Sequence, residues 1–256
     1  MASFTQLLIA SDPAGYQRAT QSPFLRRAAE GTLRKAVLGR WLANDRLYIH
    51  GYVRAAGLLL SLLPLPEVVA VDSTTTADPE SELLAWTVDA LVNIQREASF
   101  FVSTAARYGL DVNLPIDAST GRVPPSAKLE GLRRFEALFD GLRAGGEEQP
   151  LPWLEAAVVF YATERCYLDA WTWAKGHLDE GKDGSGDEDG GAVRCAFIAN
   201  WTDPGFVAFV DRLGAIIDGA VKAQGETVAE TLRKRGLVKW REVLAAEEAF
   251  WPSVDE

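Results

Sequence analysis

The chain has 256 residues, enough for one large domain with a sizeable core or for two small ones. Its formal net charge of −10 argues against nucleic acid and anionic membrane surfaces as partners, because both favour an excess of Lys and Arg. Hydrophobic residues make up 48% of the chain and charged residues 24%, which is ordinary for a globular protein.

The two cysteines, Cys166 and Cys195, form no C-x-x-C pair and no disulfide framework, so a reducing compartment is expected. The N-terminal residues lack the charged and apolar regions of a signal peptide. The longest apolar run, at about 55–65, is too short to span a bilayer. We therefore expect a cytoplasmic protein.

Apolar periodicity, proline and glycine predict a chain that is almost entirely helical. The run at 67–72 is the one strand-like segment, and Gly236 marks a bend in the last helix. The absence of βαβ alternation, repeats and phosphate loops favours an all-α, single-domain helical bundle over 1–256, with a flexible acidic, Gly-rich insert at 178–191. Helices are predicted over 4–10, 12–30 (in short pieces), 33–63, 78–108, 126–143, 150–176, 192–202, 204–223 and 227–251.

The helix predicted over 78–108 has acidic residues in its first turn, Glu80 and Glu82, which complement the helix dipole. Gly109 fits the position after its last turn. Its predicted apolar stripe consists of Leu84, Val88, Leu91, Ile94 or Gln95, Ala98, Phe101, Ala105 and Tyr108.

Three other helices each carry one acid on an otherwise apolar, aromatic face: Asp45, Glu164 and Glu247. Each acid lies three or four residues from apolar neighbours on both sides, as the stripe of a buried helix requires. A carboxylate in that register is costly unless it is paired, hydrogen-bonded or protonated. These acids are therefore candidate site residues.

If the three faces line one cavity, it is an aromatic pocket with converging carboxylates and no Lys or Arg in the same registers. Such a pocket suits a flat ligand that stacks on rings and donates N–H groups or carries a positive charge. Crowded carboxylates also push one another's pKa values apart, which suits acid–base chemistry. The alternative is that the acids pair with Arg54, Arg96 or Arg133 and only fix the helix register.

Metal and cofactor chemistry is not expected. The chain has two histidines, His50 and His177, and neither lies in a register shared with the acids. A di-iron carboxylate site needs Glu-x-x-His pairs, which are missing, and a Ser-His-Asp triad has no histidine at a usable place.

The same residues resemble the TenA (thiaminase-II-like) family. The resemblance covers nearly the whole chain and implies an all-helical, haem-oxygenase-like fold that assembles as a homodimer or homotetramer. The segments that carry it are Trp41-Leu42-x-x-Asp45-x-x-Tyr48, Phe197-Ile198-x-x-Trp201-Thr202-x-x-x-Phe206 and Glu247-x-x-Phe250-Trp251.

Within that family, the run from Phe160 to Tyr167 resembles the glutamate type, in which Glu164 stands near the position of the other type's nucleophilic cysteine. Cys166 does not match that cysteine. The resemblance implies a cofactor-free thiamine-salvage hydrolase that cleaves a C–N bond of an aminomethyl- or formylaminomethyl-pyrimidine to give the hydroxymethylpyrimidine. A non-catalytic pyrimidine-binding or regulatory protein of the same fold is the alternative.

By the same resemblance, Asp45 would hold the pyrimidine's amino group and ring nitrogen, while Glu164 and Glu247 would activate water and relay protons. The chain departs from the family where a tyrosine is usual, because Phe135 stands there. The residues expected to line the ring pocket with Asp45 are Tyr48, Tyr167 and Trp201.

Overall fold

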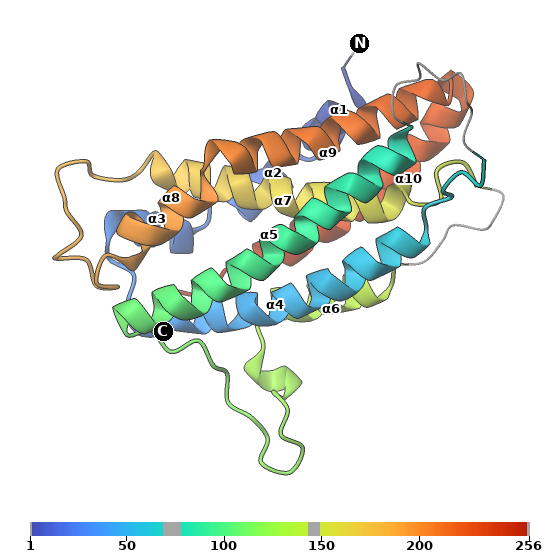
Figure 1. The fold of residues 1–256 in the computed structure, drawn as a ribbon. Coiled ribbons are helices and arrows are strands. Elements are labelled where there is room, and N and C mark those ends of the chain that lie inside the picture. The colour runs from blue at the N-terminus through green and yellow to red at the C-terminus, as the bar shows by residue number, and fades with distance from the viewer. Residues whose placement is uncertain (1, 69–77, 143–148, 255–256) are drawn as a thin grey trace.

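The computed structural model describes residues 2–68, 78–142 and 149–254, and their regular structure is entirely helical. The long helices run roughly along one direction as a bundle, and the all-α expectation is confirmed (Figure 1). The elements are α1 (Phe4–Ala10), α2 (Pro13–Thr20), α3 (Pro23–Glu30), α4 (Lys35–Ser61), α5 (Pro79–Tyr108), η1 (Pro125–Ala127), α6 (Glu130–Asp140), α7 (Leu154–Lys175), η2 (Val193–Phe197, a π-helical turn), α8 (Ile198–Trp201), α9 (Pro204–Ala223) and α10 (Glu226–Glu248).

The same N-terminal cap, an Asp or Ser followed by proline, begins four of these helices. In α2, α3, α5 and α9 an Asp or Ser side chain accepts a backbone N–H of the first turn, and proline follows it directly. The side chain satisfies an orphan donor, and proline has no N–H to lose. Gly31 and Gly109 end α3 and α5 in the left-handed conformation, at φ of 75° and 64°. Local chemistry therefore sets these six helix boundaries.

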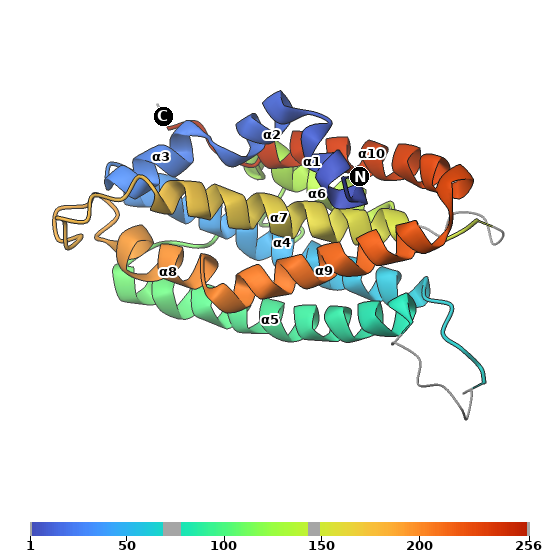
Figure 2. The same ribbon diagram turned by 90° about the horizontal axis from the view of Figure 1, so that it is seen from above.

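Helix α7 is the central element of the bundle. It packs against α2, α3, α4, α8, α9 and α10, and it lies between α2 and α9 when viewed from above (Figure 2). Buried side chains occur all round it, as expected of a helix enclosed by other helices. Any polar residue of α7 on its α4-facing side therefore meets other helices rather than bulk water.

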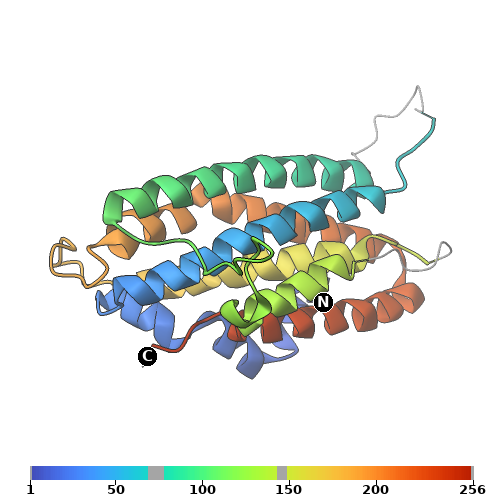
Figure 3. The same cartoon turned by 90° about the horizontal axis from the view of Figure 1, so that it is seen from below.

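Helix α6 closes the bundle against α4 and α10 (Figure 3). The Gly131 N–H donates to the Ala249 carbonyl at 3.0 Å, at the C-terminal end of α10. A Cβ on Gly131 would lie 2.3 Å from the Phe250 backbone nitrogen, so only glycine permits this approach. The contact brings the Phe135 and Phe250 rings to 5.9 Å between centroids.

Two helices, α5 and α10, differ from the sequence prediction. Val88, expected to be buried, is 48% exposed. In the first half of α5 the buried face instead runs through Leu83, Trp86 and Ala90, one residue out of register with the predicted stripe. In the second half Phe101 and Ala105 are buried as predicted. Helix α10 ends at Glu248 and is continuous through Gly236, whose missing side chain accommodates the Phe4 ring of α1.

The helix expected over 126–143 is shorter, since it consists of η1 and α6. Most of the strand-like run at 67–72 lies outside the described residues.

The acidic insert at 178–191 contacts the body of the bundle. Arg194 pairs with Asp187 at 2.8 Å, with both side chains almost fully buried. The Glu188 N–H donates to the Gly31 carbonyl at the end of α3, and the Asp189 side chain caps the Val193 N–H. These contacts tie the insert to α3 and η2, while its flexibility stays a prediction.

Candidate functional site

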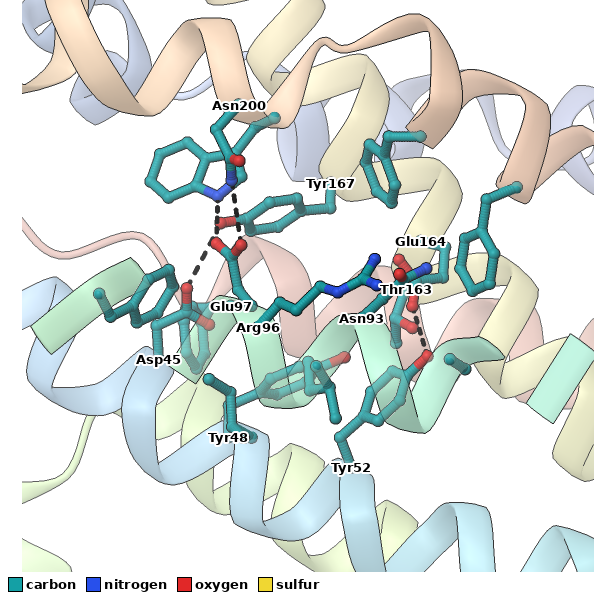
Figure 4. Close-up of a pocket in the computed structure, with 18 of the residues that line it drawn as sticks. Asp45, Tyr48, Tyr52, Asn93, Arg96, Glu97, Thr163, Glu164, Tyr167 and Asn200 are labelled. Atoms are coloured by element: carbon teal, nitrogen blue, oxygen red, sulfur yellow. Dashed lines mark hydrogen bonds between the residues drawn. The ribbon is translucent and has the colours of Figure 1, made fainter. Parts of the chain in front are cut away.

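One cavity of about 480 Å³ lies inside the bundle, between α4, α5, α6, α7, α8, α9 and α10. Its size is typical of a small-molecule site, and its walls are mainly aromatic rings with a few polar groups. The lining side chains shown in Figure 4 point toward this space from several helices. The aromatic lining residues are Trp41, Tyr48, Tyr52, Phe101, Phe135, Tyr167, Trp201, Phe206, Phe209, Phe250 and Trp251.

All three acids singled out in the sequence line this cavity, from three helices. Asp45 comes from α4, Glu164 from α7 and Glu247 from α10. Asp45 and Glu247 are 5% and 6% exposed, whereas Glu164 keeps more accessible surface. The structure therefore brings together residues separated by up to about two hundred positions in the chain, and their catalytic roles stay predictions.

A fourth acid, Glu97 of α5, also lines the cavity and was missed by the sequence analysis. Its two oxygens accept hydrogen bonds from the Trp201 indole N–H at 2.5 Å and from the Asn200 side chain at 3.0 Å (Figure 4). The signal existed: Glu97 lies seven residues after the buried Ala90 and four before the buried Phe101. The stripe predicted for α5 ran through Ile94 or Gln95 and then Ala98, so it did not include Glu97.

Two tyrosines of the cavity donate hydrogen bonds to acids (Figure 4). Tyr52 Oη lies 2.5 Å from Glu164 Oε1, and Tyr167 Oη lies 3.4 Å from Asp45 Oδ2. Burial, followed by the charge of Glu164 for Tyr52 and of Asp45 for Tyr167, raises the pKa of each tyrosine well above its ordinary value. Both hydroxyls therefore remain protonated donors at neutral pH.

The acids themselves are shifted toward their neutral forms. Burial raises the pKa of Asp45, Glu247 and Glu97, and for Asp45 the charge of Glu97 adds to it. Burial and the Glu97 charge raise the pKa of Glu164 to about 7, against the lowering effect of the Tyr52 hydrogen bond. Glu164 is thus populated in both protonation states near neutral pH, which suits a group that takes up and releases a proton.

Arginines do not neutralise the cavity acids in the described parts of the chain. Arg54 pairs with Asp140, and Arg133 pairs with Glu130, both at the protein surface. The expectation of a cavity without Lys or Arg is wrong in one respect, because Arg96 lines it. Arg96 is exposed, and no ion pair joins it to an acid among the described residues. It lies on α5 directly before Glu97.

The residues expected to form the ring pocket also lie in the wall. Tyr48, Tyr167 and Trp201 line the cavity, and Trp201 packs on Trp171 with ring centroids 4.3 Å apart. Phe135 stands edge-on to Tyr48 at 5.0 Å, so a ring fills the place where the family resemblance suggests a tyrosine. The wall at that point therefore offers an apolar edge in place of a hydroxyl.

Histidine and cysteine are missing from the described residues that line the cavity. Cys166 faces the other side of α7 and is 1% exposed. Burial, with the charges of Glu247 and Asp169, raises the pKa of its thiol. A buried, protonated thiol is a poor nucleophile.

The fold of this chain is similar to that of known structures. No protein-family model matches the chain. A TenA homologue from Pyrococcus furiosus matches with a TM-score of 0.69 at 21% identity, over 97% of this chain and 98% of that chain. This chain has the TenA fold. That fold is all-α and haem-oxygenase-like, as the sequence resemblance implied.

Two further solved structures share the TenA fold. A TenA family transcription regulator from Silicibacter sp. TM1040 matches with a TM-score of 0.67 at 14% identity, over 98% of this chain and 95% of that chain. A TenA homologue from P. horikoshii OT3 gives 0.64 at 17% identity, over 98% and 99% of the two chains. At sequence identities this low, the similarity establishes the fold alone.

A curated relative is described as a probable transcription factor, from Fusarium pseudograminearum. It is 27% identical over 227 residues, which is 78% of this chain. The match spans 42% of that protein, so this chain covers less than half the length of the relative. No helix in the described parts of this chain has the length and hydropathy needed to cross a bilayer.

Proposed function

We propose that the cavity binds an aminopyrimidine and hydrolyses its exocyclic C–N bond, as a glutamate-type member of the TenA family. The observation that carries the proposal is the convergence of Asp45, Glu97, Glu164 and Glu247 on one aromatic cavity, without arginine partners among the described residues. Carboxyl groups can accept from an amino group and donate to a ring nitrogen, while aromatic walls stack on the flat ring. An aminopyrimidine has both features.

The reaction requires a base for water and an acid for a neutral leaving nitrogen. In its ionised form Glu164 takes a proton from water, whose oxygen forms the new C–O bond as the C–N bond breaks. An aminomethyl substrate bound as its ammonium leaves directly as ammonia. A neutral leaving nitrogen, as in the formylated substrate, takes a proton from Glu247, whose pKa burial raises well above its ordinary value. An aminomethyl substrate and water thus give the hydroxymethylpyrimidine and ammonia, and a formylaminomethyl substrate gives formamide instead.

Asp45 has a binding role in this proposal. It lies at the Tyr167 end of the cavity, and Tyr167 donates to its Oδ2 atom. Oδ1 and the remaining lone pair of Oδ2 are left for the pyrimidine's amino group and ring nitrogen. The family resemblance also carries forward, as a proposal, a homodimer or homotetramer, which size-exclusion chromatography with light scattering would test.

The test is hydrolysis of 4-amino-5-aminomethyl-2-methylpyrimidine and its formylated form by purified protein, followed by chromatography of the hydroxymethyl product. Glu164→Gln should reduce both rates, and Glu247→Gln the rate with the formylated substrate, by at least about a hundredfold. The matched control is Glu248→Gln, since Glu248 is adjacent to Glu247 but exposed and paired with Arg18. No product from the wild type, or equal rates for Glu164→Gln and wild type, would overturn the proposal.

A second candidate is a regulatory protein that binds a pyrimidine without chemistry. Two similar proteins are described as a TenA family transcription regulator and a probable transcription factor, which favours this candidate. Phe135, where the family resemblance suggests a tyrosine, favours it as well. Saturable pyrimidine binding that Asp45→Asn abolishes, without any product, would support this candidate over the hydrolase.

A further inference from the structure

Glu97 is a partly buried acid of the cavity that the proposed reaction does not use. Both of its carboxylate oxygens accept from neutral N–H donors, the Trp201 indole and the Asn200 amide. Among the described residues it has no ion pair, and Arg96 on the same helix is exposed. Hydrogen bonds from neutral groups stabilise a carboxylate without cancelling its charge.

The charge of the Glu97 carboxylate acts on the pKa values of other cavity groups. The carboxylate contributes to raising the pKa of Asp45 on α4, and of Glu164 and Tyr167 on α7. The titratable and charged groups around the cavity are Asp45, Tyr48 and Tyr52 of α4, Arg96 of α5, Glu164 and Tyr167 of α7, Asp203 before α9, and Glu247 of α10.

Glu247 provides an independent observation that points to a polar ligand group in this cavity. Its side chain is 6% exposed and lines the cavity, yet no hydrogen bond to it occurs among the described residues. A buried carboxyl without a partner carries a desolvation penalty that a ligand's donor group would relieve.

We propose that Glu97 is a specificity-determining residue that makes this cavity select positively charged planar ligands over neutral ligands of the same shape. A cation placed among the four acids replaces carboxylate–carboxylate repulsion with attraction, and the aromatic walls add cation–π contacts. A neutral isostere leaves the repulsion in place. This inference rests on the proposed function. It predicts that the aminomethyl-pyrimidine, a primary ammonium, is preferred as substrate over its neutral formyl derivative.

The charge preference can be measured with a probe pair that does not depend on pyrimidine chemistry. Benzamidinium is a planar cation and benzamide is its neutral counterpart of nearly the same shape. By calorimetry at pH 7.5 the wild type should bind benzamidinium at least about tenfold more tightly than benzamide. Glu97→Gln should reduce that ratio to about threefold or less, while the Kd for benzamide changes less than about twofold.

The matched control is Glu82→Gln, which removes a negative charge from the exposed first turn of the same helix. It should retain the wild-type ratio. A ratio unchanged by Glu97→Gln, or tighter binding of benzamide than of benzamidinium, would overturn the inference.

Glu97→Gln removes the acceptor of the Trp201 indole N–H, so a second test uses the wild-type protein. Binding of a cation lowers the pKa of nearby carboxyl groups, so benzamidinium should displace protons from the acids. The binding enthalpy should then differ between phosphate and Tris buffers, whose ionisation enthalpies differ, and affinity should rise from pH 6 to pH 8. Equal enthalpies in the two buffers would contradict the inference.

The outcomes separate this inference from the proposed function. Selective binding of benzamidinium without hydrolysis of either pyrimidine supports the charge preference and removes the hydrolase. Hydrolysis of both pyrimidines at similar kcat/KM, with no preference between the probes, supports the hydrolase and removes the role of Glu97.

Discussion

Tyr52 Oη donates a 2.5 Å hydrogen bond to Glu164 Oε1, joining α4 to α7 across the cavity. The bond stabilises the ionised carboxylate and so opposes the effect of burial on the Glu164 pKa. The tyrosine is therefore placed to set the pH at which Glu164 becomes a base.

Tyr52→Phe should raise the pKa of Glu164 above its value of about 7, because the stabilising donor is lost while burial remains. If Glu164 acts as an ionised base, the acidic limb of the kcat/KM profile should move to higher pH and the rate at pH 7 should fall. The pH–rate profile measures this, and Tyr108→Phe, on α5 away from the cavity lining, is the control. An unshifted profile would show that the hydroxyl does not tune Glu164.

Glu164→Gln should make the protein less sensitive to alkaline pH. The pKa of Glu164 is raised from 4.5 to about 7, so between these values the native state holds a proton that the unfolded state releases. The free energy of unfolding of the wild type therefore falls as pH rises through this window, by at most about 3 kcal/mol from this group. Urea unfolding at pH 5 and pH 8 should show a smaller decrease for the variant. A decrease equal to that of the wild type would contradict a raised pKa.

Asp187→Ala should destabilise the protein through the acidic insert. The Asp187–Arg194 pair is 2.8 Å long, and its side chains are 5% and 8% exposed, so removal of one partner leaves a buried charge. A loss of about 3 kcal/mol is expected in urea unfolding. The exposed neighbour Glu188 provides the control Glu188→Ala, which should stay near the wild type.

Hydrogen exchange at the Glu188 amide, which donates to the Gly31 carbonyl, tests the flexibility predicted for the insert. Fast exchange at that amide would support a flexible segment, and strong protection would contradict it.

Iodoacetamide should modify Cys195 and spare Cys166 in the native protein. Cys195 is exposed, whereas Cys166 is buried and its thiol pKa is raised by burial and by nearby acids. Peptide mass analysis before and after denaturation distinguishes the two sites. Hydrolytic activity should survive the native-state reaction, and its loss on labelling of Cys166 would indicate a cysteine-dependent mechanism.

The main error of prediction was the register of the first half of α5, and its cause is visible in the structure. Helix α5 packs against α4 and α9, yet it also exposes Val88, Val92 and Val102. Two apolar faces on one helix give an ambiguous periodicity, and a shift of one residue rotates the assigned face by roughly 100°. With the face uncertain in this way, Glu97 did not stand out as an acid in a buried stripe.

The helix ends and the odd acids were properties of the sequence alone. Asp–Pro and Ser–Pro starts and glycine ends act within a few residues, so they are legible without neighbours. Asp45, Glu164 and Glu247 stood out because each interrupts a stripe on a single helix. Whether these acids met, and with which partners, depended on how α4, α7 and α10 pack together. Only the tertiary structure decided that they share one cavity with Glu97, since convergence arises from contacts between distant segments and no local pattern encodes it.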